Sequence, residues 1–182
     1  MLKKGEVLAF KTDTVWGFGA HPGDDIAINK IYQIKKRDLN KPLILMSSDF
    51  KHLKPYIKRI PEYAYLLIDK YLPGGLTLVF EKSSLCSSTL SANKTTVGVR
   101  VPDSADFSIL IEKIEGRVLA TTSCNLSNEP PVVSYSEACQ KFSNQTTIIK
   151  PIDDTKTQLI PSTVILCEDD SYKVLRRGKV KL

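Results

Sequence analysis

The pattern that decides the fold lies in residues Gly5 to Pro42, GEVLAFKTDTVWGFGAHPGDDIAINKIYQIKKRDLNKP. A short apolar run, Val7 to Phe10, predicts a strand. A segment rich in hydroxyl groups, Gly and Pro follows it, and we expect a loop from Thr12 to Gly23. The next segment has apolar residues at helical spacing, with Asp24 or Asp25 placed to cap its start. The stretch therefore predicts a strand, a polar loop at its carboxyl end, and a helix.

The expected helix ends in three cations, Lys35, Lys36 and Arg37. From spacing alone, the favoured interpretation is that these charges complement the negative end of the helix dipole and stay in solvent. The loop before the helix is more informative, because ligands of α/β sheets bind outside the carboxyl ends of strands. We expect a substrate beside the hydroxyl groups of Thr12 and Thr14.

Length and composition indicate a single domain, residues 1–182, with an ordinary share of charged and apolar residues. The net charge of +6 and the pI of about 9.1 favour an anionic partner, either a nucleic acid or a phosphorylated small molecule. No apolar run approaches the roughly 20 residues of a membrane span, and the N-terminus does not resemble a signal peptide. We expect a cytoplasmic protein with no membrane partner.

The four cysteines are scattered without a Cys-x-x-Cys pair, and the sequence has only two histidines. A zinc site needs such ligands grouped together, so we expect no metal held by protein groups.

The rest of the chain alternates between strand and helix patterns. Residues 81–94 are rich in Ser, Thr and Asn and read as a mobile surface loop, and residues 52–55 as a second loop. The interleaving predicts an α/β or α+β fold with a mixed sheet. Strands are expected at residues 43–46, 76–80, 96–101, 118–121, 146–150, 162–167 and 172–176, and helices at 61–71, 104–114 and 135–142.

Arg100 is the most informative cation because it interrupts an apolar strand. A charge that faces the interior needs an anionic partner. Two partners remain equally open: a ligand carboxylate or phosphate, or an Asp or Glu elsewhere in the chain. The sequence has no phosphate-binding Gly-rich loop, no dinucleotide fingerprint and no Ser/His/Asp set. An enzyme with this sequence would work by placing charges and orienting substrates.

Seven segments occur together in a characteristic order: residues 11–20, 31–43, 72–80, 96–103, 122–131, 161–165 and 175–180. They include a Lys-x-Arg pair at Lys35 and Arg37 and a Ser-x-Asn pair at Ser123 and Asn125. In these segments the chain resembles the YrdC family of threonylcarbamoyl-AMP synthases, in its short form with a single YrdC-like domain. The resemblance runs from about Gly5 to Gly178.

The resemblance implies an α/β fold in which a twisted mixed sheet and flanking helices surround a deep basic cavity. It implies a nucleotidyltransferase that converts L-threonine, bicarbonate and ATP to threonylcarbamoyl-AMP and pyrophosphate. The cofactor would be Mg²⁺, held by the phosphates. The product would serve a separate downstream transferase that makes N6-threonylcarbamoyladenosine at position 37 of tRNA.

The resemblance also implies site residues. Lys35 and Arg37 would be catalytic, and Arg100 would clamp the threonine carboxylate with two hydrogen bonds. The threonine site would comprise Thr14, Met46, Arg100, Thr121 and Ser162. The ATP site would comprise Lys35, Arg37, Lys41, Thr96, Ser123, Asn125, Pro131 and Arg176.

The chain departs from the family pattern at five positions. Lys11 and Gly75 stand where the family usually has Pro, and Met46 stands where it has His. Asn128 replaces a Gly, which Asn tolerates because it adopts positive φ more readily than most residues. Pro131 replaces a Ser near the nucleotide. None of these positions is a principal cation, so we expect activity to be kept.

Two alternatives belong beside the enzyme. The first is a module that binds double-stranded RNA or tRNA without synthase activity, with an affinity that falls steeply with salt. The second is a carbamoyltransferase of the hydrogenase-maturation type, disfavoured because no acylphosphatase or zinc-finger segment accompanies the domain. The enzyme interpretation predicts that Arg37→Ala or Arg100→Ala abolishes turnover and leaves the fold intact.

Overall fold

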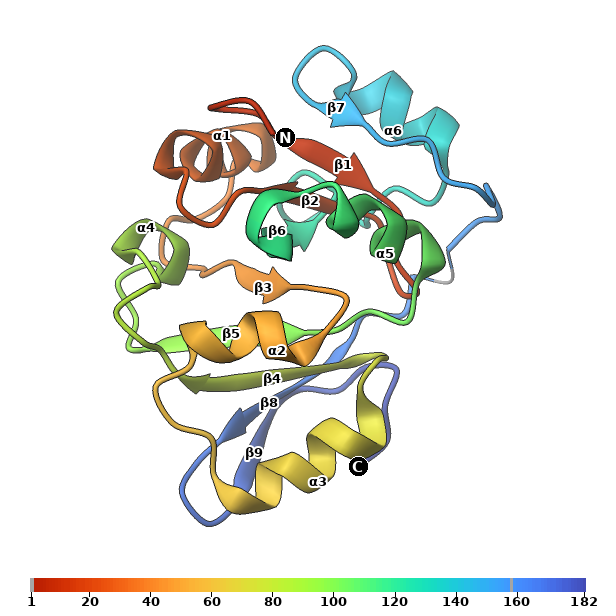
Figure 1. Cartoon of the computed structure of the whole chain (residues 1–182). Helices are drawn as coiled ribbons and strands as arrows, with labels where there is room; N and C mark the ends of the chain where they lie inside the picture. The colour runs from red at the N-terminus through yellow and green to blue at the C-terminus, as the bar shows by residue number, and fades with distance from the viewer. Residues whose placement is uncertain (1, 158) are drawn as a thin grey trace.

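A computed structural model describes residues 2–157 and 159–182, and its strands form one nine-stranded sheet in the order β7-β1-β2-β6-β3-β5-β4-β8-β9 (Figure 1). The strands are β1 (Leu8–Phe10), β2 (Gly17–Ala20), β3 (Ile44–Met46), β4 (Leu76–Glu81), β5 (Thr96–Arg100), β6 (Leu119–Ser123), β7 (Thr147–Ile148), β8 (Thr163–Cys167) and β9 (Tyr172–Arg176).

The sheet is mixed, as the alternating elements predicted. The pairs β1–β7, β3–β5 and β4–β8 are parallel, and the other neighbouring pairs are antiparallel. β3 lies between β5 and β6, with Met46 opposite Arg100 on one side and opposite Leu119 on the other. The predicted α/β class is therefore confirmed.

The helices and short 3₁₀ turns connect and flank the strands (Figure 1). Apart from α1 and α3, each has eight residues or fewer. They are α1 (Asp25–Lys35), α2 (Phe50–Leu53), η1 (Lys54–Tyr56), α3 (Glu62–Tyr71), α4 (Ser88–Ser91), α5 (Ala105–Glu112), η2 (Glu115–Arg117) and α6 (Tyr135–Phe142).

Strand alternation divides the core between the two faces of the sheet. In β1, Leu8 and Phe10 pack in a cluster with Phe107 and Ile111 of α5. Ala9, which points the other way, belongs to the larger cluster that includes buried residues of α1, α3 and α6. Successive side chains of a strand point to opposite faces, so α5 covers the face opposite to the larger cluster. The cluster on the α5 face also contains Met46, which lines the cavity of the candidate active site.

The helix predicted after the first loop is confirmed as α1. The Asp24 carboxylate accepts hydrogen bonds from the backbone N–H groups of Ile26 and Ala27, at 3.1 and 3.0 Å, and so caps the first turn. Lys36 adopts the left-handed conformation, with φ of 48°, and ends the helix. This turn brings the chain to Arg37 and the loop before β3.

Three expected loops contain regular structure. Gly17–Ala20 is strand β2, because a Cβ atom at Gly19 would lie 2.7 Å from Cε1 of Phe10, and glycine lets the strand pass beneath that ring. The expected loop at residues 52–55 lies in α2 and η1. The expected mobile loop 81–94 contains α4, whose Leu90 is buried in the core. Polar composition hid these elements because each is short and has few apolar positions.

Within the described ranges, no helix has the length and apolar character needed to cross a membrane.

Candidate active site

A cavity of about 350 Å³ opens on one face of the sheet, and its wall comes from six strands and four connecting segments. Its lining residues are Thr14, Val15, Arg37, Pro42, Ile44, Met46, Thr77, Arg100, Thr121, Thr122, Ser123, Asn125, Pro131, Pro161, Ser162, Val164 and Arg176.

The β3 residues of this wall follow the period of two that a strand imposes. Ile44 and Met46 of β3 line the cavity, whereas Leu45 between them is buried in the opposite core. Gly98 of β5 lies on the cavity face between Thr96 and Arg100, and a Cβ atom there would lie 2.8 Å from Cγ2 of Ile44. The absence of a side chain at Gly98 therefore lets Ile44, a lining residue, pack closely on β5.

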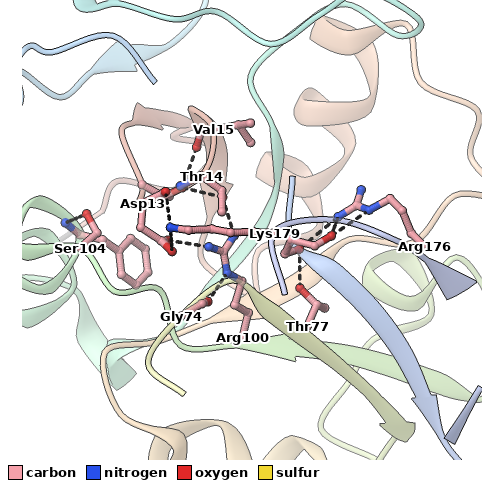
Figure 2. A network of polar contacts seen from close by, with 12 residues as sticks. Asp13, Thr14, Val15, Gly74, Thr77, Arg100, Ser104, Arg176 and Lys179 are labelled. Atoms are coloured by element: carbon pink, nitrogen blue, oxygen red, sulfur yellow. Dashed lines mark hydrogen bonds and ion pairs between the residues drawn. The ribbon is translucent and has the colours of Figure 1, made fainter. Parts of the chain in front are cut away.

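Arg100 is held by three residues from two other segments (Figure 2). Its Nη2 pairs with Oδ1 of Asp13 at 2.5 Å, Nη1 donates to Oγ1 of Thr14 at 2.8 Å, and Nε donates to the carbonyl of Gly74 at 3.0 Å. The side chains of Arg100 and Asp13 are only 2% and 6% exposed. The partner that the sequence left open is thus Asp13 of the first loop.

This pairing still leaves Arg100 able to bind a ligand. An arginine has five N–H groups, and three of them donate to partners among the described residues. Burial lowers the pKa of Arg100, and the Asp13 carboxylate opposes that shift. Because the ordinary pKa of an arginine side chain lies far above neutral pH, the group stays charged there.

A second guanidinium, that of Arg176, faces the cavity from β9 (Figure 2). Its Nη2 donates to Oγ of Ser162 at 3.0 Å, and Oγ of Ser162 is 2.8 Å from Oγ1 of Thr77. Arginine can only donate, so the Ser162 oxygen accepts here and its own proton is available to Thr77. Burial lowers the pKa of Arg176, again from a value high enough to leave it charged.

Arg37 supplies the third guanidinium and comes from the turn after α1. Its Nε donates to the carbonyl of Lys41 at 3.1 Å, and its Nη2 donates to the carbonyl of Pro42 at 3.1 Å. These bonds fix the loop between α1 and β3 against the guanidinium. Burial lowers the pKa of Arg37, while Tyr32 and Asp38 oppose the shift.

Lys35 does not stay in solvent as its position at the helix end suggested. Its side chain is buried, and Nζ donates to the carbonyl of Ser123 at 2.5 Å and to the carbonyl and Oδ1 of Asn125 at 2.9 and 2.7 Å. Oδ1 of Asn125 also accepts from Oγ of Ser123 at 2.6 Å. Burial, and then repulsion by Arg37, lowers the pKa of Lys35 from 10.5 to about 7. The ammonium supports the Ser123–Asn125 turn from outside the cavity.

Most of the predicted site residues meet at the cavity, but three do not. Lys35 lies behind the wall, and the exposed Lys41 offers only its carbonyl, to Arg37 and Tyr32. Thr96 begins β5 and lies about 13 Å along the strand from Arg100. The predicted nucleotide contacts of these three stay predictions. The lining includes Thr14, Met46, Arg100, Thr121 and Ser162 of the threonine set and Arg37, Ser123, Asn125, Pro131 and Arg176 of the ATP set.

Sequence reasoning missed Asp13 and Thr77. Asp13 stands in the predicted substrate loop, and a carboxylate in that position was the available signal for a partner of Arg100. Thr77 lies in an otherwise apolar strand at an inward-facing position, where a hydroxyl group needs a partner.

Across residues 2–157 and 159–182, no three His, Cys, Asp or Glu side chains are grouped as metal ligands. The carboxylate of Asp13, which is next in sequence to the lining residue Thr14, is already paired with Arg100 and Lys179. The cavity itself offers guanidinium and hydroxyl groups, which suit anions.

The fold and the cavity define a class: a mixed α/β protein with an arginine-lined cavity on one face of its sheet. The family described as Telomere recombination (Sua5/YciO/YrdC) matches residues 1–178. The chain belongs to this family.

Similar proteins carry a specific name. A threonylcarbamoyl-AMP synthase of Pyrococcus abyssi is 32% identical over 182 residues, which is 100% of this chain and 53% of that protein. Another, of Enterobacter sp., is 31% identical over 90% of this chain and 86% of that protein. The crystal structure of P. abyssi Sua5 complexed with L-threonine superposes with a TM-score of 0.85 and 34% identity, over 96% of this chain and 51% of that one. The chain thus spans about half the length of the P. abyssi relative.

Proposed function

We propose that this protein is a threonylcarbamoyl-AMP synthase, a nucleotidyltransferase that uses L-threonine, bicarbonate and ATP. The observation that carries the proposal is the convergence of Arg37, Arg100 and Arg176 on one cavity, from three distant segments. Three fixed cations beside hydroxyl groups suit a triphosphate and a carboxylate together. The names of the relatives and the threonine complex of P. abyssi Sua5 point the same way.

The amino acid would bind at the end of the cavity formed by Thr14, Met46, Arg100, Thr121 and Ser162. The two free N–H groups of Arg100 match the two oxygens of a carboxylate. Asp13 and Thr14 hold the guanidinium plane on one side, so a carboxylate would approach it from the cavity. Thr77 and Ser162 offer hydroxyl groups to the polar atoms of the amino acid.

The nucleotide would lie against Arg37, Ser123, Asn125, Pro131 and Arg176. In the first step the threonine amine attacks the carbon of bicarbonate, and water leaves as the carbamate forms. A carbamate oxygen then attacks the α-phosphorus of ATP, the bond to the bridging oxygen breaks, and pyrophosphate departs. Arg37 and Arg176 would stabilise the charge that develops on the leaving phosphates.

The residues fit a Mg²⁺ ion that arrives bound to the nucleotide, because the lining supplies cations and neutral groups and no free carboxylate cluster. Mg²⁺ bound to the triphosphate would neutralise part of its charge. Lys35 would act by holding Ser123 and Asn125 in place, and Arg37 by direct contact with phosphate.

The test is incubation of the purified protein with ATP, Mg²⁺, radiolabelled bicarbonate and L-threonine. We expect pyrophosphate and a labile labelled adenylate, both dependent on threonine. Omission of threonine is the control, and L-alanine tests whether the amino acid is recognised. Pyrophosphate that forms equally well without threonine, or not at all, would refute the proposal.

The double-stranded RNA or tRNA module is not favoured as an alternative. It requires cations spread over an exposed surface, whereas these three guanidinium groups line one cavity. Direct binding of tRNA, transfer of the product to a downstream transferase, and a cytoplasmic location stay predictions. Salt titration of RNA binding, with and without ATP, would test the first of them.

A further inference from the structure

The segment after β9 returns to the amino-acid end of the cavity. Lys179 lies in this segment, and its Nζ donates to the carbonyl of Asp13 at 3.1 Å and pairs with Oδ2 of Asp13 at 3.5 Å. Figure 2 shows the Lys179 side chain reaching Asp13 beside Arg100. Asp13 and Lys179 are 166 residues apart in the sequence, so this contact ties the C-terminal segment to the first loop.

The placement of Lys179 depends on Gly75. A Cβ atom at Gly75 would lie 2.9 Å from both Cβ and Cδ of Lys179, so the lysine stem lies directly on the glycine backbone. Gly75 also accepts a hydrogen bond from the N–H group of Thr163 at 2.9 Å, and Lys179 donates its own N–H to Pro161 at 2.9 Å. The absence of a side chain at residue 75 therefore makes room for the lysine that reaches Asp13.

The net charge at this end of the cavity depends on Lys179. Arg100 and Asp13 alone form a neutral pair, since one cation faces one carboxylate at 2.5 Å. Asp13 directs Oδ1 to Arg100 and Oδ2 to Lys179, so each cation has its own oxygen. With Lys179 the group has one positive charge in excess, which an anionic ligand can neutralise.

We propose that Lys179 is a positioning residue of the amino-acid subsite. By sharing Asp13 with Arg100, it leaves the Arg100 guanidinium the net charge with which it attracts the carboxylate of the substrate. Lys179 acts through Asp13 and does not touch the substrate. This inference rests on the proposed function, because it explains how that same site attracts the carboxylate of its proposed substrate.

The test is the steady-state kinetics of Lys179→Met, which keeps the length of the stem and removes the charge. We expect KM for L-threonine to rise roughly 5-fold, with kcat and KM for ATP unchanged, because the lost charge acts on one ligand at a distance. Lys179→Arg should restore most of the threonine affinity. Lys181→Met, in the same exposed segment, is the matched control and should leave all three constants unchanged.

Gly75→Ala provides an independent variant that leaves Lys179 in the chain. Its added methyl group should displace the lysine stem and raise KM for threonine by a similar factor. The double variant Gly75→Ala with Lys179→Met should then be no worse than either single variant, because both remove one contact. Additive effects would show that Gly75 acts in another way and would count against the proposal.

The outcomes separate this inference from the proposed function. If the wild-type protein turns over and Lys179→Met leaves KM for threonine unchanged, or lowers kcat instead, the inference fails and the proposed function stands. If the wild-type protein does not turn over, the proposed function fails. The inference is then decided by calorimetric binding of L-threonine: weaker binding to Lys179→Met than to Lys181→Met supports it, and equal binding overturns it.

Discussion

Arg176 holds Ser162 through three hydrogen bonds: Nε and Nη2 donate to its carbonyl at 3.1 and 2.9 Å, and Nη2 also donates to its hydroxyl at 3.0 Å. Ser162 belongs to the predicted threonine set and Arg176 to the predicted ATP set. The two ends of the cavity are therefore in direct contact. A phosphate that attracts Arg176 would change the hydrogen bonding of the Ser162 hydroxyl, which also faces Thr77.

Replacement of Arg176 tests the nucleotide end. Arg176→Ala should raise KM for ATP roughly 10- to 100-fold, because a hydrogen-bonded charge on a phosphate is lost. Arg177→Ala is the matched control, since this neighbouring cation lies outside the cavity. The measurement is pyrophosphate release at varied ATP. A similar loss in both variants, or none in Arg176→Ala, would contradict the assignment.

Replacement of Arg100 should cost stability as well as activity, even where the fold stays intact as expected. The change leaves the Asp13 carboxylate buried beside only the partly exposed Lys179. Removal of one partner of a buried ion pair costs about 3 kcal/mol. We expect the free energy of unfolding in urea to fall by about this amount.

A double-mutant cycle isolates the contribution of this ion pair. Asp13→Asn alone should also destabilise the protein, while Asp13→Asn with Arg100→Met should cost less than the sum of the two single changes, because neither charge is then left unpaired. Purely additive losses in urea unfolding would argue that Arg100 and Asp13 do not depend on each other.

The depressed pKa of Lys35 makes a prediction about pH. The amine has a pKa of about 7 when folded and an ordinary value of 10.5 when exposed. Between these values the unfolded chain binds the extra proton, so the free energy of unfolding rises with pH, by about 1 kcal/mol per pH unit from about 7.5 to 9.5. Well below pH 7 both states are protonated, and this contribution to the pH dependence disappears.

Comparison of wild type with Lys35→Met, by urea unfolding at several pH values, measures this rise. The difference between their free energies of unfolding should change with pH between about 7.5 and 9.5. Lys30 lies on the same helix and is less buried, so the free energy of unfolding of Lys30→Met should follow the same pH dependence as that of wild type. A wild-type curve that stays parallel to that of Lys35→Met would show that the three acceptors around Nζ keep the amine charged.

Gly98→Ala tests the packing of the lining residue Ile44 on β5. The new methyl group would lie 2.8 Å from Cγ2 of Ile44 and 3.5 Å from Cγ2 of Thr77, so the Ile44 side chain or the strand that carries it must shift. Such overpacking costs about 1–3 kcal/mol, and the Tm should fall accordingly. Ile44→Ala removes the opposing atom, and the double variant should lose less than the two single variants together. If the double variant loses as much stability as the two single variants together, the contact is refuted.

The sequence predicted most long elements because their signals are local. The helix α1 had both its apolar spacing and its Asp24 cap in the sequence, and α6 has the predicted bounds, residues 135–142. β2 was missed because its pattern, Gly-Phe-Gly-Ala, has glycines that read as loop residues until the Phe10 ring is seen to cover them.

The site was predictable only in part because its contacts are not local. Resemblance to a family found ten of the lining residues, yet the partner of Arg100 is 87 positions away and the lysine that reaches Asp13 is 166 positions away. Lys35 shows the limit most clearly. Its charge and its position at a helix end predicted a side chain exposed to solvent. Only the packing of the Ser123–Asn125 turn around it reveals that the amine is buried.

The parallel pairing of β4 with β8 has a consequence for how the protein matures. Thr77 and Ser162 are 85 positions apart, so they meet only after the ribosome has synthesised the chain between them, and Arg176 emerges later still. Substrates that together contact all three can bind only a chain whose last strands have docked. Ligand binding would therefore report only fully folded molecules. A ligand present during refolding would shift the equilibrium towards the folded state by mass action.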